Sequence, residues 1–88
     1  MDTPAFDMTA FFARGGMMSL MGTPGAPPTI PRTGQGDHTT GLAMLGAVLS
    51  ALLMRERTGK GSVVDASLLR VASWQARFYC LAWWLVVR

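Results

Sequence analysis

The sequence has little cysteine, histidine and charge, and each shortage argues against a class of protein. Its 88 residues include one cysteine, Cys80, and one histidine, His38, so they offer neither an internal disulfide nor a zinc site built from several Cys and His ligands. Only 15% of the residues are charged, and the basic residues behind the net charge of +3 are scattered. Nucleic-acid-binding proteins gather basic residues on one face. We therefore expect no metal, no nucleic-acid partner and a cytoplasmic location.

Hydrophobic residues are in excess, at 50% of the chain with 7 Met and 3 Trp. A chain of this length buries only about 60% of its unfolded surface. The surplus apolar surface must be covered by a partner chain, a membrane or another part of a larger protein. The longest apolar run, residues 41–54, is shorter than the roughly 20 residues that span a bilayer, so we expect no membrane contact and a buried helix instead.

The first third of the chain predicts a broken helix and a loop. Apolar residues at three- and four-residue steps from Pro4 to Met21 favour helix, interrupted at Gly15-Gly16. Residues 22–36 are rich in proline and glycine and cannot form regular structure. We expect an ordered loop packed on a larger body, because long irregular loops in compact proteins are usually functional.

The rest of the chain predicts a helix, a strand and a second helix. Residues 39–58 form the best helical pattern, apolar on nearly every side, with a stop at Gly59. Residues 62–67 contain two adjacent valines and are predicted to form a short strand. Residues 68–87 are again helical in pattern, with Cys80 expected to be buried. The order indicates one mostly helical α/β fragment, a single partial domain over residues 1–88.

Asp37 is the residue with the clearest chemical potential. It follows the glycine-spaced loop 34–36 and precedes the longest helix, so we predict that it caps this helix by accepting hydrogen bonds from the amides of Thr39 or Thr40. The flanking glycines leave room for a substrate near the backbone. An accessible carboxylate can attack an activated acyl group and form a mixed anhydride or thioester. Because most N-cap aspartates only cap, these residues alone leave both roles open.

A series of motifs in fixed order resembles the family III CoA-transferases, which include formyl-CoA transferase, carnitine CoA-transferase and the related α-methylacyl-CoA racemases. The resemblance covers nearly the whole chain to about Ser73, and residues 74–88 are not matched to the family pattern. Its motifs are Pro4-Ala5-Phe6-Asp7, Arg14-Gly15-Gly16-Met17-Met18, Gly36-Asp37, Thr40-Gly41, Arg55-Glu56-Arg57-Thr58-Gly59-Lys60-Gly61 and Val64-Asp65-Ala66-Ser67-Leu68-Leu69.

The resemblance implies that Asp37 is a nucleophile. In these transferases an aspartate at its position attacks an acyl-CoA thioester, and a covalent aspartyl intermediate passes CoA to a carboxylic acid. The racemases use a histidine and an aspartate as acid and base. Their histidine aligns with Phe6, which carries no proton, so transfer is favoured. The resemblance gives supporting roles to Asp7, Gly36 and His38, and makes acyl-CoA and a carboxylic acid the substrates.

The resemblance also implies that this chain is an internal piece of a larger enzyme. Family members are several times longer and form interlocked homodimers. We expect the chain to be part of their large Rossmann-like domain, without most of the CoA-binding surface, and to be inactive alone; its CoA-binding residues are not identified. Two alternatives are a non-enzymatic helical interaction module, with residues 41–54 and 78–87 as binding faces, and a small membrane-associated protein.

Overall fold

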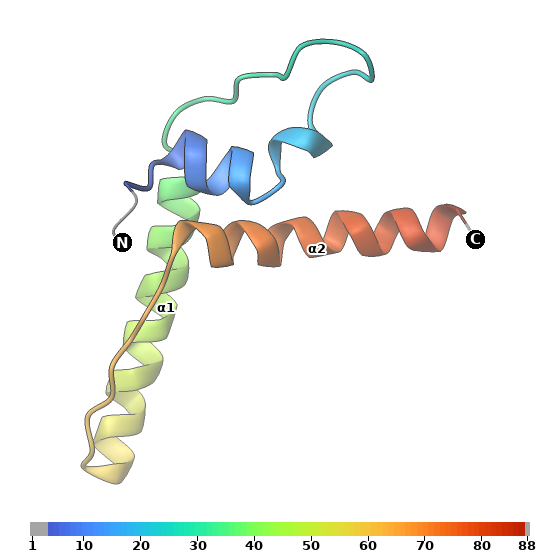
Figure 1. Ribbon diagram of the computed structural model, residues 1–88. Helices are drawn as coiled ribbons and strands as arrows, with labels where there is room; N and C mark the ends of the chain where they lie inside the picture. The colour runs from blue at the N-terminus through green and yellow to red at the C-terminus, as the bar shows by residue number, and fades with distance from the viewer. Residues whose placement is uncertain (1–3, 88) are drawn as a thin grey trace.

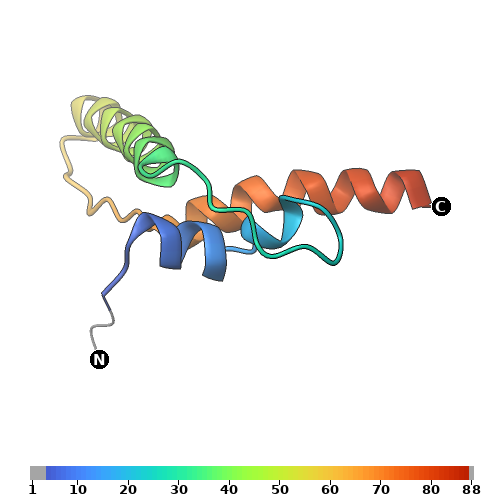
Figure 2. The same cartoon turned by 90° about the horizontal axis from the view of Figure 1, so that it is seen from above.

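The computed structural model describes residues 4–87, and these residues form four helical segments (Figure 1). The segments are a π-helix η1, a short 3₁₀-helix η2 and two long α-helices, α1 and α2. Helices α1 and α2 diverge from a common junction, where η1 packs against both (Figures 1 and 2). The bounds are Asp7–Arg14 for η1, Met18–Leu20 for η2, Gln35–Thr58 for α1 and Leu68–Val87 for α2.

The predicted strand at residues 62–67 is wrong. This segment is extended and returns along α1 (Figure 1), but it pairs with no other strand among the described residues. Val63 is 96% exposed. Two β-branched residues suit a strand, but a strand also needs a neighbouring backbone with which to exchange hydrogen bonds. Of the predicted mostly helical α/β fragment, the helical part is therefore confirmed and the strand is not, for the part of the chain that the structure describes.

The N-terminal helical pattern forms two short helices, η1 and η2. The first begins at Asp7 rather than at Pro4. The predicted break at Gly15-Gly16 is confirmed. A Cβ atom at Gly15 would collide with the Phe11 carbonyl oxygen and with Ala72 of α2, and Gly16 has a φ of +79°. The first glycine therefore permits close packing of η1 on α2, and the second permits the chain to turn.

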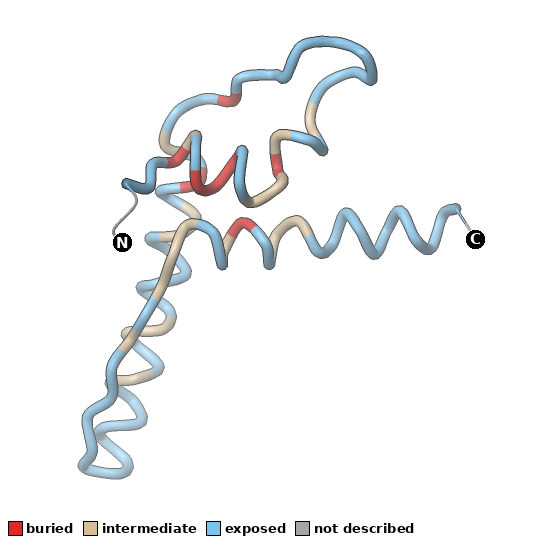
Figure 3. Tube along the Cα trace, in the orientation of Figure 1, coloured by how far each residue is buried: buried red, intermediate tan, exposed pale blue. Residues whose placement is uncertain are grey.

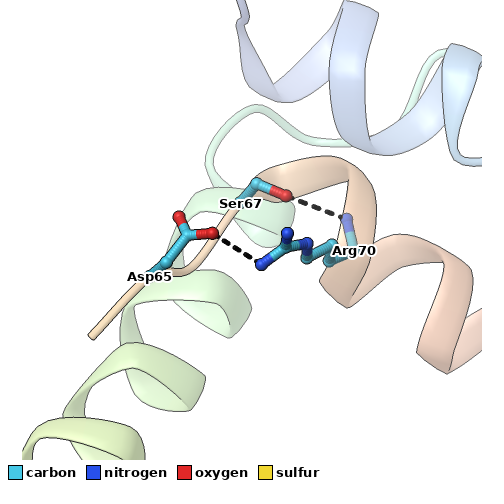
Figure 4. Close-up of polar contacts among 3 residues, drawn as sticks. All are labelled: Asp65, Ser67 and Arg70. Carbon is cyan, nitrogen blue, oxygen red and sulfur yellow. Dashed lines mark hydrogen bonds and ion pairs between the residues drawn. The ribbon is translucent and has the colours of Figure 1, made fainter. Parts of the chain in front are cut away.

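Both long helices end or begin with local caps. Gly59 has a φ of +71° and donates its amide to the Arg55 carbonyl at 2.8 Å, which confirms the predicted stop of α1. At the start of α2, the Ser67 hydroxyl accepts a hydrogen bond from the Arg70 amide at 3.2 Å. The Arg70 guanidinium pairs with Asp65 at 2.6 Å (Figure 4), and both side chains are exposed. Asp65 thus supports the entry into α2.

The core is small and lies at the junction of η1 with the two long helices. Its buried apolar residues are Ala10, Phe11, Phe12, Met17 and Ala72. The rings of Phe11 and Phe12 meet edge to face at a centroid distance of 5.1 Å. Figure 3 shows that the buried residues gather around η1, whereas both long arms are largely exposed.

The long helices carry most of the exposed apolar surface. Residues 41–54, which were predicted to be buried inside a larger protein, are mostly exposed in this chain. The predicted burial of Cys80 is wrong within this chain, because Cys80 is exposed on α2. Covering this surface takes more protein than the described residues provide. By length and composition, α1 could cross a membrane, with a mean hydropathy of 1.3 and none of that window buried.

Candidate functional site

Asp37 lies in the first turn of α1, with an exposed side chain. It is the third helical residue, because α1 begins at Gln35, four residues earlier than predicted, and Gly34 occupies the N-cap with a φ of +90°. The prediction that Asp37 caps the helix through Thr39 or Thr40 is therefore wrong. Its carboxylate has no hydrogen-bond partner among the described residues.

Asp7 caps α1 instead, from a distant part of the chain. Its Oδ2 accepts a hydrogen bond from the Gly34 amide at 2.6 Å, and its Oδ1 accepts one from the Asp37 amide at 3.2 Å. These amides belong to the first turn of α1, whose N–H groups have no partner inside the helix. The carboxylate of Asp7 thereby links η1 to the N-terminus of α1.

Helix η1 packs closely against the N-terminal turn of α1 at Gly36. It is buried, and a Cβ atom there would collide with Asp7 Oδ1 and with the ring of Phe11. Only a residue without a side chain lets η1 approach α1 closely enough for Asp7 to reach both amides. The supporting role predicted for Gly36 thus has a steric basis in this structure.

The charge of Asp7 is buried, with 5% of the residue exposed. The salt bridge between Arg70 and Asp65 lies elsewhere, and no cationic side chain pairs with Asp7 among the described residues. Its charge is balanced by the two backbone N–H groups and by the positive end of the α1 dipole. Burial excludes Asp7 from direct contact with a substrate, whereas Asp37 next to it is accessible.

The link between Asp7 and α1 was not predicted, because it joins residues 27 and 30 positions apart. No local pattern in the sequence points toward it. The start of α1 at Gln35 places Gly34, which has no side chain to accept a hydrogen bond, at the N-cap. The acceptor therefore comes from a distant part of the chain.

His38 does not share a surface with Asp37. It is exposed and lines a cleft of about 520 Å³ between the three larger helices, whose lining does not include Asp37. Consecutive helical residues point about 100° apart, so the two side chains leave α1 in different directions. The structure therefore brings Asp7, Gly36 and Asp37 together, whereas the His38 ring lies beside Gly34, 3.7 Å from where a Cβ atom of that residue would be. The cleft is lined by Phe11, Phe12, Met17, Met21, Gln35, His38, Thr39, Gln75 and Tyr79.

Phe6 precedes Asp7 at this end of the molecule and is 67% exposed. Its amide donates to the Thr9 hydroxyl at 3.2 Å, at the start of η1.

The described residues contain no group of three or more His, Cys, Asp or Glu side chains arranged to hold a metal ion. The carboxylate that the structure exposes at this end of the molecule is that of Asp37, in the first turn of α1.

Comparison with known proteins gives one consistent result. The family model described as CoA-transferase family III matches residues 1–86, beyond the point near Ser73 where the sequence motifs end. The chain is 44% identical over 71 residues to (R)-2-hydroxy-4-methylpentanoate CoA-transferase of Clostridioides difficile, a match that covers 81% of this chain and 18% of that protein. No solved structure matches at a significant level.

Two further relatives carry the same kind of name. Cinnamoyl-CoA:phenyllactate CoA-transferase of Clostridium sporogenes is 39% identical over 71 residues, covering 81% of this chain and 17% of that protein. Acetyl-CoA:oxalate CoA-transferase of Acetobacter aceti is 42% identical over 66 residues, covering 74% and 17%. The chain spans less than a fifth of the length of these relatives.

Proposed function

This chain belongs to CoA-transferase family III, and from that premise we propose that Asp37 is the nucleophile in the transfer of CoA from an acyl-CoA thioester to a carboxylic acid. The observation that supports this most directly is the exposed Asp37 carboxylate, free of hydrogen-bond partners among the described residues, in the first turn of α1. A nucleophile needs an accessible lone pair, and this carboxylate has one.

The reaction requires no oxidant or reductant. An Asp37 oxygen attacks the thioester carbonyl carbon, the C–S bond breaks, and CoA leaves as the thiolate, so that a mixed anhydride remains. The thiolate attacks the Asp37 carbonyl carbon and releases the donor carboxylate, which leaves an aspartyl-CoA thioester. The acceptor carboxylate attacks the carbonyl carbon of this thioester, the C–S bond breaks, and a second mixed anhydride, between Asp37 and the acceptor, remains. The released CoA thiolate attacks the acceptor acyl carbon of this anhydride, the C–O bond to the Asp37 carboxylate breaks, and the acceptor leaves as its CoA thioester with Asp37 regenerated.

Transfer fits this site better than racemisation. Racemisation at the α-carbon needs a proton donor and acceptor on either side of that carbon. Phe6, at the position where the related racemases have a histidine, is exposed and apolar. It can contact an acyl or pantetheine chain but cannot move a proton. Asp37 alone suffices for the acyl-transfer steps above.

We propose that these residues act within a larger protein and are inactive as an isolated chain. The curated relatives are more than five times as long as the matched stretch. The junction of η1, α1 and α2 is the only packed core among the described residues. Because the chain covers less than a fifth of these relatives, the activity test must supply the remainder of the enzyme.

A chimera supplies that remainder. The 71 matched residues of the Clostridioides difficile relative are replaced by the corresponding residues of this chain, and the relative's own CoA transfer is assayed. We expect the chimera to be active and Asp37→Asn to abolish the transfer. Glu56→Gln, which removes an exposed carboxylate at the other end of α1, is the matched control. Activity retained in Asp37→Asn would contradict the proposed role.

A further inference from the structure

We propose that Asp7 is a positioning residue for Asp37: it takes over the capping of α1, so that the Asp37 carboxylate stays free to react. This inference rests on the proposed nucleophilic role of Asp37 and adds a second aspartate to that site. It is carried by the two hydrogen bonds from the Gly34 and Asp37 amides to the buried Asp7 carboxylate, at 2.6 and 3.2 Å.

The position of Asp37 creates a competition that Asp7 resolves. In a capping box, a Glu or Gln side chain at the third helical position reaches back and accepts a hydrogen bond from the N-cap amide. Asp37 is at the third position and Gly34 is the N-cap. In the absence of Asp7, we infer that the Asp37 carboxylate, an acceptor at that same position, binds the Gly34 amide. Asp7 Oδ2 occupies that amide instead, and the Asp37 side chain is left without this partner.

Asp7 also fixes the backbone of Asp37. Its second oxygen binds the Asp37 amide, and Gly36, between the two bound amides, is held against Asp7 and the Phe11 ring. Phe11 belongs to the small core. The nucleophile is thus anchored through its own main chain to the best-packed part of the molecule, while its side chain points to the exposed side.

Burial separates the two roles. Asp7 is 5% exposed and cannot meet a thioester, whereas Asp37 is exposed. A carboxylate that accepts two backbone hydrogen bonds has its lone pairs engaged, and one without such partners has them available. In this inference the carboxylate of η1 is structural and that of α1 is reactive.

The test is Asp7→Asn in the chimera described above, with the rate of covalent adduct formation on Asp37 measured by rapid quench and mass spectrometry. Asn is nearly isosteric but presents an N–H₂ group to one of the two amides. We expect the adduct to form on Asp37 about 10- to 100-fold more slowly, as a displacement of about 1 Å can cause, with KM for acyl-CoA unchanged. Asp65→Asn, which removes an exposed carboxylate at the start of α2, should keep the parent rate.

Two further readouts separate this inference from the proposed function and from misfolding. Asp7→Glu keeps the charge but moves the carboxylate by one methylene. We expect adduct formation on Asp37 to remain slow in this variant, while its backbone-amide NMR spectrum shows a folded chain. In the present chain without CoA, a carbodiimide should modify Asp37 more slowly in Asp7→Asn than in the parent, because the Asp37 carboxylate then binds the Gly34 amide. The carboxylate of Glu56 serves as the internal reference.

Parent-like rates in Asp7→Asn, by adduct formation or by carbodiimide, would overturn the inference. Absence of any adduct in the parent chimera would contradict the nucleophile alone, and the carbodiimide comparison would still decide the role of Asp7.

Discussion

Gly36 controls how closely η1 approaches α1. The space that a side chain would need there is filled by Asp7 and the Phe11 ring, and both the small core and the cap of α1 depend on that contact. A single methyl group at this position must therefore push the two helices apart or displace the Asp7 carboxylate.

Gly36→Ala should destabilise the folded chain by about 1–3 kcal/mol, the usual cost of overpacking. The measurement is thermal denaturation of the chain followed by circular dichroism. Gly46→Ala is the matched control: this glycine also lies within α1, but nothing is within 4 Å of the added Cβ, so the change should stabilise by up to about 1 kcal/mol. Equal stability of the two variants would show that the predicted contact is absent.

The sequence was sufficient to single out Asp37 and Gly36, because a carboxylate between glycines before a long helix is a local pattern. It was insufficient to assign the cap. Which carboxylate reaches the Gly34 amide depends on the route of the loop between η1 and α1, and that route is set by tertiary packing. Adjacency in the sequence likewise does not show whether the His38 side chain lies beside the Asp37 carboxylate, because that also depends on how the chain packs.

The helices differ in how much of them could be predicted. The two long helices follow from apolar periodicity, and the stop of α1 at Gly59 follows from glycine at the C-cap, which are local properties. The strand at residues 62–67 does not form, because its hydrogen bonds would have to come from another strand, and the described residues contain none. The start of α2 is instead capped by Ser67, beside the exposed pair of Asp65 with Arg70 (Figure 4).

Ser67→Ala should lower the stability of the chain by about 1 kcal/mol, since it removes the acceptor for the Arg70 amide at the start of α2. Ser73→Ala is the control within the same helix. Its hydroxyl donates to the Leu69 carbonyl, a bond that contributes little, and alanine is the better helix former. Urea denaturation of both variants decides the matter: an equal effect on the two would mean that Ser67 is no cap.

The molecule as a whole is too open for its length. Its Cα radius of gyration is 16.3 Å, against about 12 Å for a compact chain of this size. Its accessible surface is 7251 Å², against about 5,000 Å² for a compact protein of this mass. The excess lies mainly on the apolar arms, and it supports the expectation that α1 is covered by other parts of a larger protein.

A bilayer is a weaker candidate for covering α1. The stretch without charged residues between Asp37 and Arg55 is about 25 Å long in a helix, which is less than the roughly 30 Å of a hydrocarbon core. We expect the chimera to be recovered from the soluble fraction without detergent.

Leu49→Gln distinguishes a covered face of α1 from an exposed one. Leu49 is 57% exposed in this chain, so the substitution should change the stability of the isolated chain by no more than about 0.5 kcal/mol. In the chimera, where the remainder of the enzyme is present, we expect a loss of about 2 kcal/mol or more, because a polar amide is then buried. Equal effects in the two settings, measured by urea denaturation, would contradict coverage of this face.

The most direct test of the central claim is to locate the covalent intermediate. The chimera is mixed with the acyl-CoA donor of the relative and quenched with hydroxylamine, which converts an activated aspartyl carboxylate into a stable hydroxamate, and its peptides are examined by mass spectrometry. We predict modification of Asp37, its loss in Asp37→Asn and its persistence in Glu56→Gln. CoA transfer that proceeds with Asp37 unmodified, or with the modification on another residue, would contradict the account.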